Sequence, residues 1–309
     1  MIFGLLLFIL TPSPVHGHHP DKVRCSCEEA DEQIVLFGDS LSDNGNGVGQ
    51  LYDFQFPLPP YYNFRFSNGP VWIELFPTKD LHDYAYGGAV VNQSASNNGP
   101  PSLMGQVNDY LISNHFNLSC VAKKTQYIFW GGSNDILITL SAQTSQGFNE
   151  SLAALAVGLP LLTAGQIGKL INAGAIDILV MLLPSWSNTP LAAALSSHQR
   201  QLLSQFTEVI NADIISKVSA VATSGVNLKF FDVVTFTQMI IDNPGNYGLV
   251  NVTFPCLVNY KVFIHGVGGE EPIVCANPDE YLFWDGEHPT AKVHTIIANE
   301  VMRFLGWRE

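Results

Sequence analysis

The sequence has little charge, and basic residues are especially scarce. Charged residues make up 13% of the 309-residue chain, against about 25% in typical soluble proteins. Asp and Glu number 27, Lys and Arg 14, and the formal net charge is −13. No cluster of Lys or Arg is present. Phosphate backbones and anionic lipid headgroups are repelled by such a chain, so we expect no nucleic-acid partner.

The patterns of several common enzyme classes are missing. G-x-S-x-G, the nucleophile elbow of the α/β-hydrolases, does not occur. The stretch GNGVGQ at 45–50 lacks the G-x-G-x-x-G spacing of a dinucleotide site. The nine histidines show no zinc-ligand spacing, so no metal is expected.

The N-terminus lacks an apolar run long enough to span a membrane. Residues 1–17, MIFGLLLFILTPSPVHG, hold a short apolar stretch, then helix breakers and Gly17. A spanning helix needs roughly 20 apolar residues, and Pro12 comes too early for one. We therefore expect a secretory signal peptide at 1–17, an N-terminal arm at 18–32 and a single domain at 33–309, secreted and without stable membrane insertion.

Secretion is consistent with the cysteines and sequons. Cys256 and Cys275 flank a Gly-rich loop that a disulfide would restrain, and Cys120 has Cys25 or Cys27 as possible partners. No cysteine lies in a recognisable nucleophile context. N-linked glycans are expected at some of the four sequons: Asn92, Asn117, Asn149 and Asn251.

Short apolar runs alternate with longer helical patterns. The predicted strands are 33–38, 82–88, 125–132, 176–184 and 227–233, and the predicted helices are 69–77, 103–115, 147–172, 191–224 and 290–305. Strands that alternate with helices require crossover connections and a parallel sheet. The fold class is therefore α/β: a three-layer α/β/α sandwich with a central parallel five-stranded sheet. The apolar region 152–184 is interrupted by Pro160 and Asp177, so we predict a buried helix and then a buried strand.

Polar residues follow these strands where ligands bind in parallel sheets, beyond the carboxyl ends. FGDSLSD at 37–43 presents Ser40, and a serine hydroxyl becomes a nucleophile only when a base takes its proton. DGEHP at 285–289 supplies Asp285 and His288, three apart before the last predicted helix, so the carboxylate can orient the imidazole toward Ser40. The N–H groups of Ser40 and Gly88 and the amide of Asn134 are candidate oxyanion donors. We assign Asp39 and Asp43 to holding the serine turn.

Four motifs taken in order, FGDSLSD, YAYGGA, GGSND and DGEHP, resemble the blocks of the GDSL or SGNH hydrolase family, over residues 34–305. The resemblance implies the flavodoxin-like SGNH fold and no cofactor. It makes Ser40 the nucleophile, His288 the general base and then acid, and Asp285 its orienting group, with Ser40, Gly88 and Asn134 forming the oxyanion hole. Gly87 adjoins Gly88, which is chosen for its spacing from Ala85.

RFSNGPVWIE at 65–74 is similar to secreted fungal members of the family, which include esterases of acetylated carbohydrates. We therefore expect a secreted esterase that removes acetyl or other short acyl groups from plant-wall carbohydrates. An extracellular lipase or phospholipase, or a secreted binding protein without turnover, are the alternatives. Aromatic side chains can stack on sugars or hold acyl chains, and Tyr61, Tyr62 and Trp72 are the candidate substrate-binding residues.

Overall fold

The computed structural model describes residues 32–45, 47, 57–92, 99–116, 118, 121–140, 145–259 and 271–307. The predicted signal peptide, nearly all of the N-terminal arm, three cysteines and one sequon lie outside these residues: Cys25, Cys27, Cys120 and Asn117.

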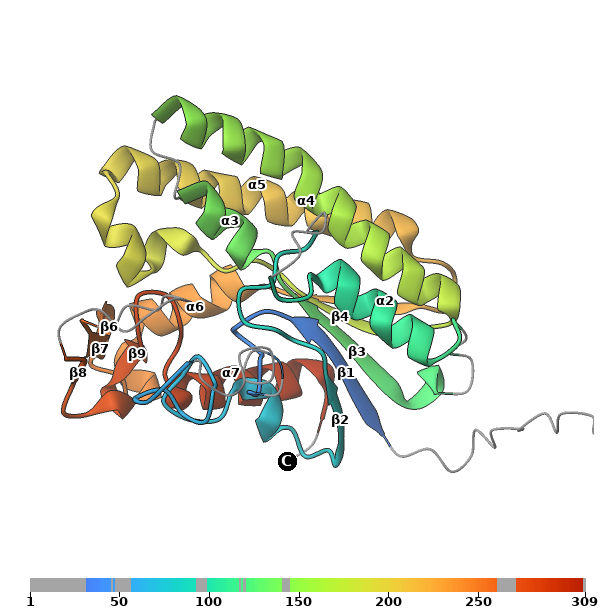
Figure 1. Ribbon diagram of the computed structural model, residues 1–309, viewed down its shortest axis with the longest axis horizontal. Coiled ribbons are helices and arrows are strands. Elements are labelled where there is room, and N and C mark those ends of the chain that lie inside the picture. The colour runs from blue at the N-terminus through green and yellow to red at the C-terminus, as the bar shows by residue number, and fades with distance from the viewer. Residues whose placement is uncertain are drawn as a thin grey trace, which may run out of the picture.

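A five-stranded parallel sheet forms the centre of the fold, as the sequence predicts (Figure 1). Its strand order is β2-β1-β3-β4-β5. The central strands are almost completely buried, because helices cover both faces of the sheet. The strand bounds are β1 Gln33–Gly38, β2 Asp80–Asp83, β3 Thr125–Trp130, β4 Asp177–Met181 and β5 Asn227–Phe231.

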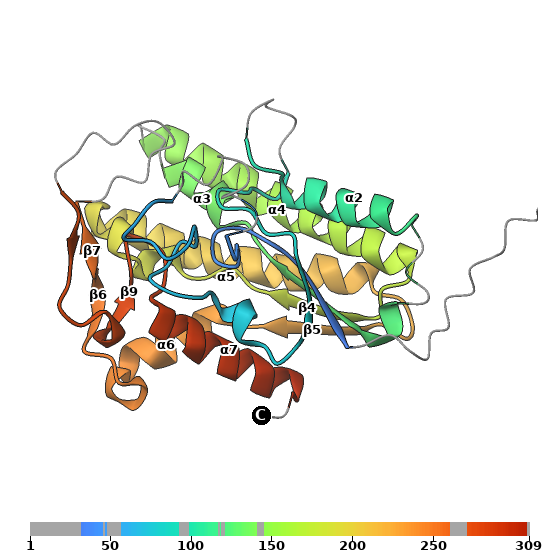
Figure 2. The same cartoon turned by 60° about the horizontal axis from the view of Figure 1, so that its bottom comes forward.

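Alternate side chains of each strand enter two separate cores. In β1, Val35 and Phe37 pack on one face, and Ile34 and Leu36 on the other. Helices α2 (Leu103–Ser113), α4 (Ser145–Ala173) and α5 (Ser197–Val221) cover the first face. Helices α6 (Val233–Asp242) and α7 (Ala291–Leu305), with a 3₁₀ turn at Trp72–Leu75, cover the second. Figure 2 shows the sheet between these two layers. This is the predicted three-layer sandwich.

Several element bounds differ from the sequence prediction. The second strand ends at Asp83 instead of residue 88; the Tyr84 and Tyr86 N–H groups still donate to the Leu36 and Gly38 carbonyls of β1, and the chain reaches a left-handed turn at Gly88, with φ 80°. The helix expected at 69–77 is only the 3₁₀ turn. The helix expected at 191–224 is interrupted at Ser196, which caps α5 through Gln199. Helices α3 (Ser133–Leu140) and α6 were not predicted.

Helix α4 is long and apolar enough to span a membrane by composition. Its residues Leu159 and Ile167 are buried in the core beside α5, so it serves as a core helix, as predicted. Its opposite face is exposed at Val157 and Leu161.

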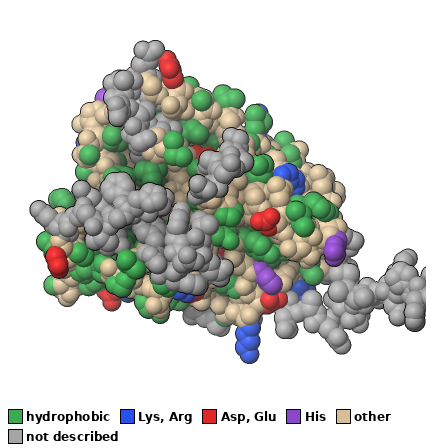
Figure 3. Space-filling model, viewed as in Figure 1, with side chains coloured by type: hydrophobic (Ala, Val, Ile, Leu, Met, Phe, Trp, Pro, Cys, Tyr) green, Lys and Arg blue, Asp and Glu red, His purple; other side chains and the backbone are tan. Residues whose placement is uncertain are grey.

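A small subdomain of short strands follows α6. Strand β6 (Asn251–Pro255) pairs with β9 (Tyr281–Phe283), and β7 (Leu257–Val258) pairs with β8 (Ile273–Val274). The predicted Cys256–Cys275 disulfide joins this region. Few Lys and Arg side chains appear on the face shown in Figure 3, in line with the composition. Asn92 and Asn149 are exposed and Asn251 is half-buried.

Candidate active site

The turn that carries Ser40 begins where β1 ends. The N–H groups of Ser42 and Asp43 donate to the Asp39 carbonyl at 3.0 Å, and the Leu41 N–H donates to Asp39 Oδ1 at 3.1 Å. Ser40 itself is only 9% exposed. The predicted role of Asp39 in holding this turn is confirmed.

Asp43 fastens this turn to the loop after β2. Its Oδ1 accepts from the Gly45 N–H at 2.9 Å and its Oδ2 accepts from the Gly87 N–H at 2.8 Å. A Cβ on Gly87 would lie 2.2 Å from the Phe66 ring, so only glycine fits at this position. The Phe66 ring in turn packs 5.1 Å from the His288 ring, centroid to centroid.

Asp285 and His288 lie in the turn between β9 and α7. His288 Nδ1 is 2.7 Å from Asp285 Oδ2, and His288 Nε2 is 2.8 Å from Ser40 Oγ. The three side chains, predicted to meet although Ser40 and His288 are far apart in sequence, form one continuous hydrogen-bonded relay. All three residues are buried, so water is largely excluded from the relay.

The Asp285 carboxylate accepts four hydrogen bonds. Its Oδ1 accepts from the N–H groups of Glu287 and His288 at 2.9 and 2.7 Å, and its Oδ2 accepts from His288 Nδ1 and from the Tyr61 hydroxyl at 2.6 Å. Burial alone would raise the pKa of Asp285. The charge of His288 and these hydrogen bonds outweigh burial and lower that pKa below its usual value.

The pKa of His288 is raised. Burial alone would lower it, but the carboxylates of Asp285 and Glu287 outweigh that effect and raise the pKa of His288 to about 9. The Glu287 side chain lies beside His288 on the wall of the site, and burial raises its own pKa.

The predicted oxyanion donors are only partly brought together. Asn134, at the start of α3, lines the same cavity as Ser40, and one of its amide hydrogens is bonded to the Ala89 carbonyl at 2.9 Å. Gly88 does not line that cavity; it borders a separate hollow beside Asp135. The adjacent Gly87 N–H is already bonded to Asp43.

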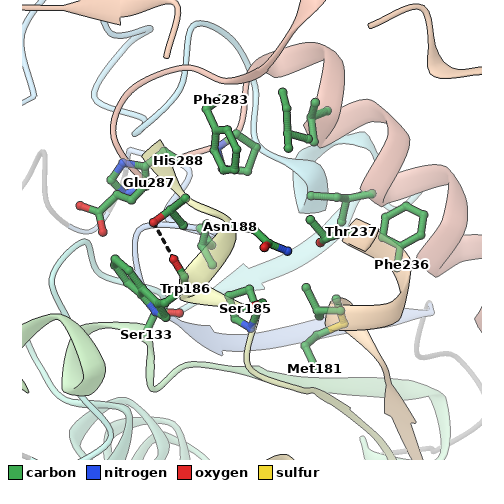
Figure 4. Close-up of a pocket in the computed structure, with 18 of the residues that line it drawn as sticks. Ser133, Met181, Ser185, Trp186, Asn188, Phe236, Thr237, Phe283, Glu287 and His288 are labelled. Carbon is green, nitrogen blue, oxygen red and sulfur yellow. Dashed lines mark hydrogen bonds between the residues drawn. The ribbon is translucent and has the colours of Figure 1, made fainter. Parts of the chain in front are cut away.

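A cavity of about 80 Å³ extends inward from Ser40. Figure 4 shows His288, Glu287 and Ser133 at one end of it and Met181 and Phe236 at the other. The walls come from the ends of β1, β3, β4 and β5 and from α6 and α7, and apolar side chains make up most of the lining.

None of the three predicted substrate-binding aromatics lines this cavity. Trp72 is fully buried in the core, where its indole N–H donates to Ser42 Oγ at 3.0 Å. Tyr61 is 3% exposed and bonds Asp285. Tyr62 is exposed and lies under the Arg65 guanidinium, 5.7 Å from its ring centroid. Trp72 and Tyr61 are therefore too buried to stack on a substrate in this structure, whereas Tyr62 stays a predicted contact outside this cavity.

Sequence reasoning missed the role of Glu287 and assigned Tyr61 to the substrate instead of to Asp285. Tyr61 bonds Asp285 across 224 positions, and no local pattern indicates that contact. Glu287 stands inside the DGEHP motif, so its position next to His288 was a usable signal. Among the described residues, no group of three or more His, Cys, Asp or Glu side chains is placed to hold a metal ion.

Comparison with known proteins points to a family of lipases and acylhydrolases. Residues 34–301 match the model of the GDSL-like Lipase/Acylhydrolase family. The chain is 26% identical to the phosphatidylcholine-sterol acyltransferase of Aeromonas hydrophila, over 88% of this chain and 90% of that protein. It is also 26% identical to the thermolabile hemolysin of Vibrio parahaemolyticus, over 87% of this chain and 63% of that protein. Among solved structures, the acetylxylan esterase Axe2 of Geobacillus stearothermophilus is 14% identical with a TM-score of 0.41, over 90% of this chain and 95% of that one.

Proposed function

The chain belongs to the GDSL-like lipase/acylhydrolase family, and we propose that it hydrolyses carboxylic esters through an acyl-enzyme on Ser40. The observation that carries this proposal is the relay from Ser40 through His288 to Asp285, with contacts of 2.8 and 2.7 Å. Nucleophile, base and orienting carboxylate are thereby within reach of one another.

In the first half of the reaction, Ser40 Oγ attacks the ester carbonyl carbon while His288 Nε2 takes the hydroxyl proton. Asp285 accepts the hydrogen bond from Nδ1 and stabilises the imidazolium that forms. The carbonyl oxygen becomes an oxyanion, and the tetrahedral intermediate then breaks its bond to the alcohol. The alcohol leaves with the proton from His288, and the acyl group stays on Ser40.

In the second half, a water molecule takes the place of the alcohol. His288 removes one proton from it, the resulting hydroxide attacks the acyl carbon, and the Ser40–acyl bond breaks with return of the proton to Oγ. The acid is released and the enzyme is restored. Ester and water give acid and alcohol, so no cofactor is consumed.

For the oxyanion we propose the Ser40 N–H and the Asn134 amide as donors, because both residues line the cavity. Such preorganised donors typically lower the barrier by about 3–4 kcal/mol each. Gly88 remains a proposed third donor; in this structure it borders the neighbouring hollow instead.

The substrate class divides into the two alternatives expected from the sequence. The expected sugar-binding aromatics Tyr61, Tyr62 and Trp72 do not line the cavity beside Ser40, so they give the carbohydrate alternative no support there. A relative named phosphatidylcholine-sterol acyltransferase favours the lipase or phospholipase alternative. Secretion and the fungal subgroup stay predictions. The Cys256–Cys275 disulfide and the exposed sequons at Asn92 and Asn149 support secretion.

Labelling with a fluorophosphonate tests the proposed function directly. We expect one equivalent of label on Ser40 of the wild type, together with hydrolysis of p-nitrophenyl butyrate. Ser40→Ala should take no label and lose at least a thousandfold in kcat. A folded protein that takes no label would be a binding protein and not a hydrolase.

A further inference from the structure

We propose that the cavity beside Ser40 binds the acyl chain of the ester, and that the chain it takes is apolar and several carbons longer than acetyl. This inference rests on the proposed function, since it assumes that Ser40 is the acylated residue. It adds a substrate class that the relay alone does not specify.

The polarity of the cavity changes from one end to the other. Ser40, Asn134 and Glu287 lie at the end where the chemistry is proposed. Met181 and Phe236 of the second core lie at the far end (Figure 4), and further side chains of that core line the cavity, among them Phe231, Ile240, Val293 and Ile297. A sugar hydroxyl placed there would lose its hydrogen bonds to water and find few acceptors in exchange, so that end favours hydrocarbon.

The cavity is too large for an acetyl group alone. One water needs about 10–15 Å³ by this measure of volume, and the cavity holds about 80 Å³. An acetyl methyl would leave most of this volume empty. A chain of several methylenes would fill it and would gain roughly 0.8 kcal/mol for each methylene removed from water.

The alcohol part of the substrate must lie elsewhere. It departs with a proton from His288 Nε2, so it sits on the histidine side of Ser40, next to Glu287. The acyl chain is then directed toward α6 and α7.

Thr237 offers a place to shorten the cavity. It lies on α6, is half-buried, and lines the apolar end beside Phe236 (Figure 4). Thr237→Phe would fill that end while leaving the relay untouched. Met239 is on the same helix, is 44% exposed and does not line this cavity, so Met239→Phe is the matched control.

The experiment measures kcat/KM for p-nitrophenyl acetate, butyrate, hexanoate and octanoate below their aggregation concentrations. For the wild type we expect kcat/KM on the hexanoate ester to exceed that on the acetate ester at least tenfold. Thr237→Phe should lower kcat/KM for the octanoate and hexanoate esters at least tenfold and change kcat/KM for the acetate ester less than threefold. Retained turnover of the acetate ester shows that the variant is folded. Met239→Phe should match wild type.

The acyl-cavity inference would be overturned if the wild type had its highest kcat/KM on the acetate ester. It would also be overturned if Thr237→Phe lowered kcat/KM by the same factor at every chain length. If Thr237→Phe does not fold, the dependence of wild-type kcat/KM on acyl-chain length still tests the acyl-cavity inference. Absence of hydrolysis and of fluorophosphonate labelling in the wild type would instead overturn the proposed function.

A separate observation supports a second inference: we infer that Tyr61 is a positioning residue for the relay. Its hydroxyl donates to Asp285 Oδ2 at 2.6 Å, on the same oxygen that faces His288 Nδ1. Its ring packs edge-on against Trp284 and Phe66. This bond shares the carboxylate charge between Tyr61 and His288, so it limits how strongly Asp285 holds the imidazolium.

Tyr61→Phe tests this inference, with Tyr62→Phe as the same chemical change at an exposed neighbour. Without the hydroxyl, Asp285 should stabilise the imidazolium more strongly, which raises the pKa of His288 and moves the acid limb of kcat/KM to higher pH. We expect a three- to tenfold loss at pH 7, with recovery at high pH. If the acid limb of Tyr61→Phe coincides with those of the wild type and Tyr62→Phe, Tyr61 has only a packing role, even if the Tyr61→Phe variant is less stable.

Discussion

Two turns bring their residues to the site, and each contains a fully buried carboxyl group. Asp39 precedes the nucleophile and Asp285 precedes the proposed base. Among the described residues, the Asp39 carboxyl accepts one hydrogen bond, from the Leu41 N–H, and its buried Oδ2 has no partner. Asp285 accepts four. Burial raises the pKa of Asp39 to about 7, whereas the pKa of Asp285 is lowered.

The difference shows that burial alone does not decide the charge of a carboxyl group. Hydrogen-bond donors and a neighbouring cation offset desolvation at Asp285, and a single N–H cannot do so at Asp39. The first turn therefore holds a carboxyl that can be neutral near pH 7, and the second holds an ionised carboxylate beside the histidine on which the proposed mechanism forms an imidazolium.

The largest expected effect comes from removing that anion. Asp285→Asn should lower kcat by about 10³–10⁴-fold, because an amide in this position favours the wrong imidazole tautomer. Steady-state kinetics on p-nitrophenyl butyrate measure it. Asp39→Asn, the same change at the other turn, should stay within about tenfold of wild type. Equal losses would remove the distinction between the two turns.

A smaller effect is expected on the nucleophile side, where Asn134 is proposed to stabilise the oxyanion. Asn134→Ala should cost about 10²-fold or more in kcat with little change in KM. Asn188→Ala is the control, since Asn188 lines the same cavity without a proposed role. Thermal melting should show both variants folded. A purely KM effect for Asn134→Ala would count against its role as a donor.

The dependence of kcat/KM on pH reports the pKa of His288 in the second turn. The general base must be neutral, and the pKa of His288 is raised to about 9 by Asp285 and Glu287 against the effect of burial. We therefore expect kcat/KM to rise with pH, to reach half its maximum near pH 9 and to level off above that pH. Glu287→Gln removes one of the carboxylates and should move the rise to lower pH. A flat profile between pH 4 and 8 would contradict this role of His288.

The smallest effect concerns stability at the first turn. The pKa of Asp39 is above its unfolded value of 3.8, so the folded chain keeps a proton that the unfolded chain loses, and stability falls as pH rises toward 7. Asn cannot ionise, so Asp39→Asn should melt at a higher temperature than wild type at pH 8, by a few degrees. The gap should shrink at pH 4. A gap that does not depend on pH would mean that Asp39 has the same pKa in the folded and the unfolded chain.

The sequence predicts the sheet well, because β1, β3 and β4 are continuous apolar runs bounded by polar turns. Helix α3 was missed because its first residues belong to GGSND and resemble a turn. Helix α6 was missed because it follows β5 with only Asp232 between them. The length of β2 was overestimated because the aromatic and small residues at 84–88 continue the strand-like pattern beyond Asp83, where the regular pairing with β1 ends.

At the site, the relay was predictable because its three residues stand in short motifs at strand ends. The contacts and the cavity around these three residues could not be predicted from the sequence. The Tyr61 contact and the apolar cavity depend on how α6, α7 and the loop at 57–67 pack, which is a property of the tertiary structure. Gly88 illustrates the limit: motif spacing selects it, and the fold turns it toward another hollow.

The order of the parts along the chain has a consequence for biosynthesis. Ser40 lies in the turn after the first strand of the sheet, while His288 lies in the turn before the last helix. During translation the nucleophile leaves the ribosome long before its base exists, and a chain cut short anywhere in α7 loses the packing that seats the imidazole. The proposed ester cleavage should therefore appear only after α7 has emerged from the ribosome.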